Sequence, residues 1–219
     1  MTDKPYVSII RFTEQCLDMH GDNFRGVGWT KTQEEADRRY RVMLDLLAPA
    51  GGRPVTLLDF GCGASHLYEY IRRLGRHDID YSGLDVSKRF LDLSRRKFPD
   101  VTYYDVDVLD DYGALPHFDY IVMNGIFTVR SALSVAAMTE YFEAVVARVW
   151  ARARRGIAFN VMSKYVDWER DDLFHMPLET LAKFLTHQIS RHFVLRHDYG
   201  LYEYTAYVYR DPVTVEPRR

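Results

Sequence analysis

A pair of glycines directly after an apolar run is the part of this sequence with the clearest chemical meaning. The run that begins at Val55 ends on Asp59, and Gly61 and Gly63 follow at once. Glycine is used where the backbone takes a positive φ or lets a ligand come within contact distance of the main chain. The order therefore predicts a buried strand, a tight turn and a helix, with a small ligand gripped by the turn beside the carboxylate of Asp59.

The residues after the turn narrow the class of ligand. A dinucleotide-binding turn carries a third glycine, which lets the helix pack close to the strand, and His66 stands at that position. The Asp-x-Gly-x-Gly order instead resembles motif I of the class I S-adenosylmethionine-dependent methyltransferases. An ordinary glycine turn between a strand and a helix is the alternative interpretation of the same residues.

A second acidic residue closes the next expected strand. Asp85 follows Asp59 by 26 positions, at the end of the segment that begins at Tyr81. An acid at the end of a second parallel strand faces the ligand crevice, where it can accept hydrogen bonds from both hydroxyls of a ribose. Asp85 can also serve as the acidic group before a helix capped by Ser87, and the two roles are compatible.

Strand patterns alternate with helical ones along the rest of the chain, which predicts a mainly parallel sheet covered on both faces. The last two expected strands are joined by a short turn at Gly200, so they must be antiparallel. The later expected strands are 101–104, 118–127, 156–162, 193–198 and 202–209, and the expected helices are 6–19, 32–50, 65–74, 88–98, 138–150 and 177–186.

The expected fold class is therefore α/β, a Rossmann-like seven-stranded, mostly parallel sheet with helices on both faces and an antiparallel C-terminal strand pair. A chain of 219 residues fits one domain with a sizeable core. Within that domain we expect residues 1–50 to form a helical lid, residues 51–211 to form the S-adenosylmethionine-binding core, and residues 212–219 to form a tail.

The methyltransferase resemblance extends over most of the chain and implies roles for particular residues. Asp59 and the backbone of Gly61 and Gly63 would hold the methionine end of S-adenosylmethionine, and Asp85 would bind its ribose. Asp107 would accept from the adenine amino group. The full set implied for this cofactor and its product S-adenosylhomocysteine is Trp29, Arg39, Asp59, Gly61, Cys62, Gly63, Asp85, Val86, Asp107, Val108, Asn124 and Phe127.

The adenine contact has a competitor nearby. Asp105 is an equally available acid, and alternation in an extended segment would put it on the same side as Asp107. The Val-Leu pair after Asp107 is what the family pattern carries, and it favours Asp107.

The segment before the first strand resembles the cofactor lid of small-molecule methyltransferases. Gly28 and Trp29 precede a helix that begins with a Thr32–Glu35 capping box. In such lids an arginine or an aromatic residue meets the methionine carboxylate, so Arg39 and Trp29 are the candidates. Trp29 could equally pack the lid onto the core.

Candidates for a general base lie near the C-terminal half of the sheet. His175 ends a long polar and aromatic loop after the fifth strand, and a histidine suits proton transfer near neutral pH. It could instead merely open the next helix. His197 is the second candidate, although a regular strand would place His197 and Asp198 on opposite faces.

The composition excludes several function classes. The chain is 47% hydrophobic with a net charge of −2, and its basic clusters fall at the ends of expected helices, where they complement the helix dipole. We therefore expect no nucleic-acid partner. Two cysteines supply neither a disulfide framework nor a metal set. No targeting peptide or membrane-spanning run is evident, so we expect a cytoplasmic protein, as a monomer or homodimer.

These observations support methyl transfer to a small molecule, most simply to an oxygen of a sugar or secondary metabolite. The position after the fourth strand reads Asn124-Gly-Ile-Phe127, whereas methyltransferases of exocyclic base nitrogens carry Asn/Asp-Pro-Pro-Tyr/Phe there. An RNA or protein methyltransferase and a non-catalytic cofactor-binding subunit are the alternatives.

Overall fold

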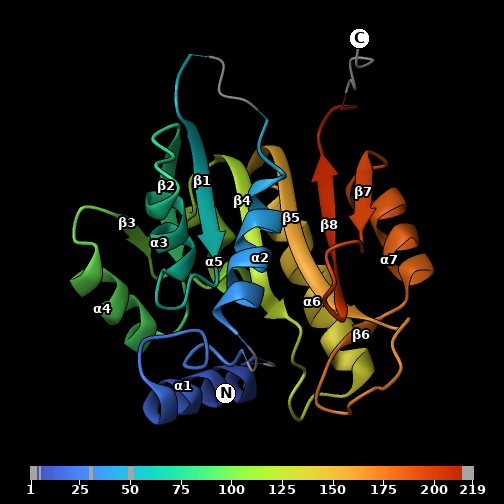
Figure 1. Ribbon diagram of the computed structural model, residues 1–219. Helices are drawn as coiled ribbons and strands as arrows, with labels where there is room; N and C mark the ends of the chain where they lie inside the picture. Colours follow the sequence, from blue (N-terminus) through green and yellow to red (C-terminus); the bar gives the residue numbers. More distant parts are fainter. Residues whose placement is uncertain (1–3, 5, 30–31, 49–51, 214–219) are drawn as a thin grey trace.

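The protein folds around one twisted sheet. We describe it from a computed structural model, which covers residues 4, 6–29, 32–48 and 52–213. The strands are β1 Val55–Phe60, β2 Ile79–Leu84, β3 Thr102–Tyr104, β4 Phe118–Phe127, β5 Ala153–Ser163, β6 His175–Met176, β7 Phe193–Arg196 and β8 Glu203–Tyr209. Their order is β3-β2-β1-β4-β5-β8-β7, with β6 paired to β5 off this path. Strand β8 pairs antiparallel with both β5 and β7, and the other pairings between these strands are parallel, which confirms the expected fold (Figure 1).

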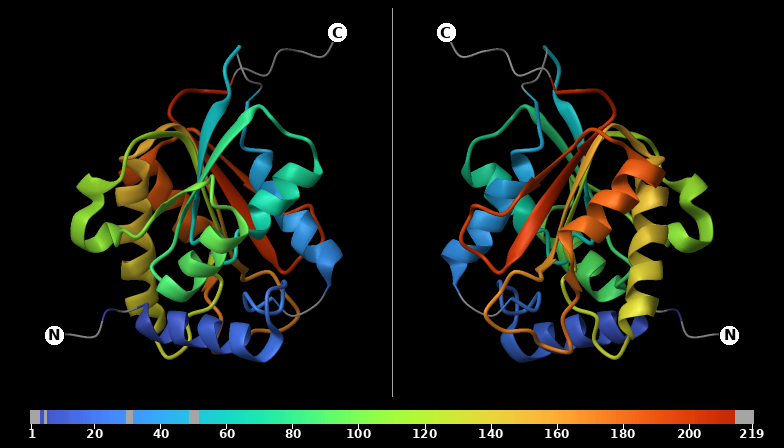
Figure 2. Two further views of the ribbon diagram at one scale, coloured as in Figure 1. Left: turned by 90° about the vertical axis from the view of Figure 1, so that its left-hand side faces the viewer. Right: turned by 90° about the vertical axis from the view of Figure 1, so that its right-hand side faces the viewer.

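Helices cover both faces of the sheet (Figure 2). They are α1 Val7–His20, α2 Gln33–Leu44, α3 His66–Arg73, α4 Lys88–Lys97, α5 Val108–Asp111, α6 Val135–Trp150 and α7 Leu178–Phe184, with short turns at Tyr112–Ala114 and Leu185–Ile189. Helices α2 and α3 bury their apolar residues on one face and α6 and α7 on the other. Because both faces are covered, the central strands β1 and β4 are mostly apolar and mostly buried.

The chain changes direction across the sheet between β1 and β4. Strands β1, β2 and β3 follow one another towards one edge of the sheet, and β4 then lies on the other side of β1. Such a switch leaves a crevice at the carboxyl ends of the strands, where open α/β sheets bind ligands. Helix α1 lies beneath these carboxyl ends (Figure 1).

Local capping explains several helix starts. The hydroxyl of Thr32 accepts from the amide of Glu35 at 3.2 Å, as the capping box predicts. Ser87 and Ser134 cap α4 and α6 in the same way. The prediction that α2 would continue to the glycines at 51 and 52 was wrong, because the helix ends at Leu44.

The structure bears on the expected tail, on membrane-spanning helices and on metal sites through the described residues alone. Most of the expected tail from residue 212 lies outside the described residues. Within the described residues, no helix is long and apolar enough to cross a bilayer, and no group of three acidic, cysteine or histidine side chains could hold a metal ion.

Candidate functional site

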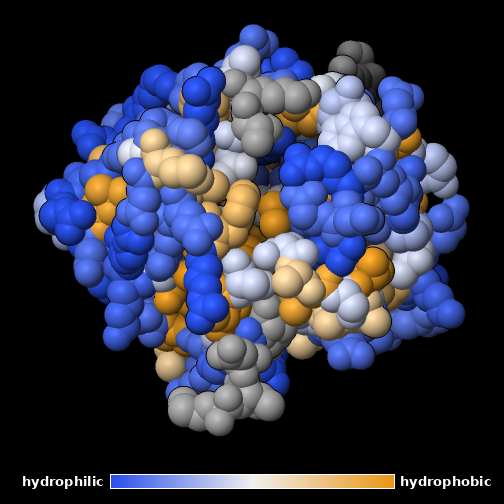
Figure 3. Space-filling model, turned by 90° about the horizontal axis from the view of Figure 1, so that it is seen from below, coloured by the Kyte–Doolittle hydropathy of each residue, from blue (hydrophilic) through white to orange (hydrophobic). Residues whose placement is uncertain are grey.

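Two adjoining cavities open at the carboxyl ends of β1, β2 and β4. The first lies between the glycine turn after β1 and helix α1. The second lies beside it, towards the loop that follows β5 and the start of β8. Seen from below, hydrophobic residues lie in the middle of this face between hydrophilic ridges (Figure 3). Both cavities are lined by Phe12, Gly28, Trp29, Thr128 and Val129.

The glycine turn forms one wall of the first cavity. The amides of Gly61 and Cys62 both donate to the carbonyl of Leu84, at 2.8 and 2.9 Å, so the turn is tied to β2. Gly61 has a φ of +78°, and a Cβ there would lie 2.3 Å from Cγ2 of Ile126. The turn therefore favours glycine at this position, and Gly61 lines the first cavity.

Two carboxyl groups stand beside the turn, the buried Asp59 and the half-buried Asp85. Asp59 is 3% exposed and accepts from the hydroxyl of Tyr81 at 2.9 Å. Asp85 accepts from the amides of Gly63 and Ser87, each at 2.9 Å. Burial raises the pKa of Asp59 to about 7 and that of Asp85 to about 6. Both groups line the first cavity, where a ligand hydroxyl or ammonium would find a strong acceptor.

A third acid, Asp107, lies at the far end of the same cavity. It caps α5 through the amide of Leu109 at 2.9 Å and contacts the side chains of Lys4 and Tyr6. Burial raises its pKa, the Lys4 and Tyr6 hydrogen bonds lower it, and the net direction is downward. The competing acid Asp105 is exposed and does not line the cavity. Asp105 and Asp107 do not share a side as they would in a strand, because the chain has left β3 and is turning into α5.

The end of β4 supplies the opposite wall. Asn124 lines the first cavity, and its Oδ1 is buried without a hydrogen-bond partner among the described residues. A buried polar atom without a partner is costly, so a ligand donor is expected there. Gly125 and Ile126 complete this wall.

The structure does not bring Phe127 to either cavity. Its side chain is 0% exposed and packs on Phe142 with ring centroids 4.8 Å apart. The register of β4 against β5 is irregular between Met123 and Phe127, and this irregularity directs the ring into the core. Cys62, Val86 and Val108, in contrast, do line the first cavity.

A series of hydrogen-bonded side chains lies behind the wall shared by the two cavities. Arg39 Nε donates to both carboxylate oxygens of Glu203 at 3.0 Å, and Asn160 Nδ2 donates to the same carboxylate at 2.8 Å. Asn160 Oδ1 in turn accepts from the amide of Gly125 at 2.7 Å. Arg39 also lies over the ring of Trp29, 5.0 Å from its centroid. Arg39 therefore lines the second cavity and not the first.

The second cavity is aromatic, and its charges are paired. Phe12, Trp168 and Tyr202 line it and are each more than one third exposed. The rings of Trp168 and Tyr202 lie 5.1 Å apart. Besides the Arg39–Glu203 pair, Arg170 Nε donates to Asp172 at 2.9 Å. This cavity thus offers ring faces and hydrogen-bonding groups with little free positive charge.

The two histidines expected as bases lie outside both cavities. His175 is 7% exposed, its Nδ1 lies 2.6 Å from the carbonyl of Ser163, and its Nε2 accepts from the amide of Arg170 at 3.4 Å. The short strand β6 holds it there by pairing with β5. His197 follows β7 on the surface, with its ring against Tyr204.

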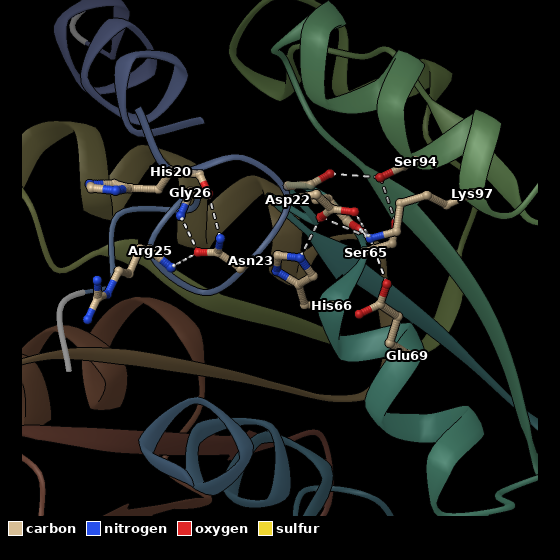
Figure 4. Close-up of polar contacts among 12 residues, drawn as sticks. His20, Asp22, Asn23, Arg25, Gly26, Ser65, His66, Glu69, Ser94 and Lys97 are labelled. Carbon is tan, nitrogen blue, oxygen red and sulfur yellow. Dashed lines mark hydrogen bonds and ion pairs between the residues drawn. The ribbon is translucent and has the colours of Figure 1, made fainter. Parts of the chain in front are cut away.

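The helix expected over residues 6–19, as part of the lid over the crevice, brings Tyr6 and Phe12 to the first cavity. Sequence reasoning missed Tyr40, His66 and Tyr141, which also line it. Of these three, only His66 had a local signal, since it stands where a dinucleotide-binding turn has glycine. Its imidazole points towards Asp22, in the segment that follows α1 (Figure 4).

Comparisons with known proteins agree with this geometry. Residues 58–156 match the family described as "Methyltransferase domain". The chain is 32% identical over 157 residues to "Putative methyltransferase Rv1506c" of Mycobacterium tuberculosis, a match that covers 71% of this chain and 93% of that protein.

Two solved structures show the same fold. Magnesium protoporphyrin IX methyltransferase from Synechocystis PCC 6803, with bound S-adenosylmethionine, has a TM-score of 0.65 and 13% identity over 96% of this chain and 100% of that chain. A 1,6-didemethyltoxoflavin-N1-methyltransferase from Burkholderia thailandensis, with its substrate and S-adenosylhomocysteine, has a TM-score of 0.59 and 18% identity over 95% of this chain and 91% of that chain.

Proposed function

Since this chain belongs to the class I S-adenosylmethionine-dependent methyltransferases, we propose that it transfers the methyl group to an oxygen of a small, uncharged acceptor, a sugar or a secondary metabolite. The observation that carries this proposal is the pair of adjoining cavities, one walled by the glycine turn and three acids, the other by aromatic rings. The first would hold the cofactor and the second the acceptor.

The residues of the first cavity fit the cofactor in three respects. Asp85 offers carboxylate oxygens for the ribose hydroxyls, and Asp107 and the amide of Val108 stand at the far end for the adenine. Gly61, Gly63 and Asn124 line the same cavity, and the Oδ1 of Asn124, which has no partner among the described residues, suits the methionine end, whose ammonium is a donor. Bound there, S-adenosylmethionine supplies an electrophilic methyl group on a sulfonium.

The assignment of Arg39 changes under this proposal. Its guanidinium is engaged by Glu203 and faces the second cavity. We therefore assign Arg39 to the acceptor side, where it supports Trp29, rather than to the methionine carboxylate.

The second cavity favours a neutral ring as acceptor. Exposed ring faces of Trp168 and Tyr202 can stack on a sugar or a planar scaffold. Both cations of this wall, Arg39 and Arg170, are already paired with carboxylates, so an anionic acceptor would find no unpaired charge among these groups. Methyl transfer is a displacement in line with the leaving sulfur, and holding the two reactants in adjoining cavities supplies proximity and alignment.

A general base at His175 receives no support from the geometry, because both of its ring nitrogens are engaged within the protein. We propose that positioning dominates and that the hydroxyl proton leaves to a carboxylate of the second cavity or to water. His175→Ala tests this directly. A loss of more than about a hundredfold in kcat, in the range of general-base contributions, with an unchanged melting temperature, would contradict it.

The acceptor class is tested by mass spectrometry of methylated products from a panel of neutral sugars, neutral phenols, anionic aromatics, RNA and peptides. The proposal predicts turnover only with neutral small molecules, and a Trp168→Ala variant with a raised acceptor KM. Methylated RNA or peptide would instead establish the alternative class. Tight S-adenosylhomocysteine binding without turnover of any acceptor would favour a non-catalytic subunit, and light scattering would distinguish a monomer from a homodimer.

A further inference from the structure

The segment between α1 and α2 is fastened to the body of the protein by four polar side chains, which we call the loop anchor: Asp22, His66, Glu69 and Lys97 (Figure 4). His66 Nε2 lies 2.8 Å from Asp22 Oδ1, and Lys97 Nζ lies 2.8 Å from Asp22 Oδ2. Lys97 also pairs with Glu69 at 2.6 Å. Asp22 is thus held from α3 and α4 at once.

The loop anchor is less exposed on its α3 and α4 side than an ordinary surface ion pair. The side chains of His66 and Lys97 are only 12% and 17% exposed, and Lys97 also donates to the carbonyl of Ala64 at 2.8 Å. The hydrogen bond from His66 and then the charge of Lys97 lower the pKa of Asp22 to about 2. Networks with shared, half-buried partners are held more firmly than isolated exposed pairs.

The residues that follow Asp22 form a stiff turn. Asn23 Oδ1 accepts from the amides of Arg25 and Gly26 at 2.9 and 3.3 Å, and the amide of Trp29 donates to the carbonyl of Phe24 at 3.0 Å. A turn closed by its own hydrogen bonds moves as one piece. Where Asp22 is held, the residues after the turn are held as well.

The turn places residues Val27–Trp29 between the two cavities, and we call this segment the partition. Val27 lies against the glycine turn, with Cγ1 3.3 Å from where a Cβ on Gly63 would stand. Gly28 and Trp29 line both cavities, and Trp29 packs on Gly125. The segment Val27–Trp29 therefore touches the cofactor-binding turn on one side and the proposed acceptor space on the other.

We propose that Asp22 and His66 are positioning residues, which fix the partition Val27–Trp29 over the cofactor and thereby set cofactor affinity and the alignment of the acceptor. His66 suits this role because it lines the first cavity and binds Asp22 at the same time. In this assignment His66, which stands where a dinucleotide-binding turn has glycine, holds the lid. The acceptor half of this assignment rests on the proposed use of the second cavity; the cofactor half does not.

The test compares two aspartates of the same lid. Asp22→Ala removes the loop anchor, and Asp18→Ala removes the exposed pair that Asp18 makes with Arg89 elsewhere on the lid. For Asp22→Ala we expect the Kd for S-adenosylhomocysteine to rise about tenfold, which is about 1.4 kcal/mol. Amide hydrogen exchange at residues 26–29 should accelerate in the same variant. Asp18→Ala should change the Kd less than about twofold, as for an exposed pair.

Rescue separates positioning from a general loss of stability. His66→Gln keeps a side-chain donor for Asp22 and should retain most of the affinity. His66→Ala should lose affinity in the same direction as Asp22→Ala but by less, because Lys97 still holds Asp22. The double variant should be no weaker than Asp22→Ala, because Asp22→Ala already removes the contact with His66. With a productive acceptor, the cofactor KM should rise far more than kcat falls.

Equal affinities for the Asp22→Ala and Asp18→Ala variants, or unchanged exchange at residues 26–29, would overturn the proposal. If Asp22→Ala does not fold, the His66→Ala and His66→Gln pair decides it by the same criteria. These binding and exchange measurements need no acceptor, so failure to find an acceptor leaves them decisive.

Discussion

Substituting Gly61 by alanine isolates the constraint at the centre of the glycine turn. The substitution meets two obstacles, a φ of +78° and a Cβ that would lie 2.3 Å from Cγ2 of Ile126. Gly75, at the end of α3, provides the matched control because its φ is +64° and nothing lies within 4 Å of its Cβ position.

The two variants should differ by the packing obstacle alone. The left-handed conformation costs an alanine roughly 1–2 kcal/mol at either position. Overpacking adds roughly 1–3 kcal/mol at Gly61 only, because Ile126 is fixed in the wall of the cavity. We therefore expect Gly61→Ala to lose about 1–3 kcal/mol more unfolding free energy than Gly75→Ala.

Urea denaturation measures the difference, and S-adenosylhomocysteine binding measures its consequence. Gly61→Ala should bind the product more weakly, since the turn and Ile126 must both shift, and Gly75→Ala should bind like the wild type. Equal stability losses, or normal binding by Gly61→Ala, would refute the view that this turn is shaped by the contact with β4.

Two further predictions concern buried charge. Burial raises the folded pKa of Asp59 from 3.8 to about 7, so the folded state holds this proton more tightly, and its contribution to the stability of the ligand-free protein is present below pH about 4 and lost as pH rises through about 7. Urea denaturation at pH 5 and pH 8 should therefore show stability falling more for wild type than for Asp59→Asn, by about 3 kcal/mol, since about two of the roughly three units of pKa shift lie above pH 5, and parallel pH profiles would contradict this. Glu203→Ala should lower the unfolding free energy by about 3–5 kcal/mol, because it leaves Arg39 without its buried partner. Glu203→Gln should cost less, and a thermal melt that ranks the two variants the other way would argue against a buried pair.

The fold was predictable because its determinants are local. Apolar runs and helical periodicity identify β1, β4 and α6, and capping at Thr32 and Ser87 marks where helices begin. The short strand β6 was not predictable. Its two residues pair with β5 across an intervening loop, and a pairing of that kind leaves no periodic trace.

The same difference between local and distant determinants applies to the site. The glycine turn and Asp85 were predictable because the motif and the end of a strand coincide in the sequence. Phe127 was assigned to the crevice on position alone, but the irregular register of β4 turns its ring into the core. His175 was assigned on chemistry, and pairing through β6 buries it instead.

Contacts between distant segments were the least visible from sequence. The hydrogen bond between His66 and Asp22 spans 44 positions, and that between Arg39 and Glu203 spans 164. Neither pair stands at a spacing that any regular element would reveal, so tertiary packing alone brings them together.

Calorimetric titration with S-adenosylhomocysteine tests the central claim most directly, because it asks whether the acids of the first cavity bind the cofactor. Asp85→Asn changes the proposed ribose acceptor, and Asp105→Asn changes an exposed acid outside the cavity. We expect one saturable site in the wild type, affinity about tenfold weaker for Asp85→Asn, a loss of about 1.4 kcal/mol, and unchanged affinity for Asp105→Asn. No saturable binding by the wild type, or equal affinity for all three proteins, would contradict the account.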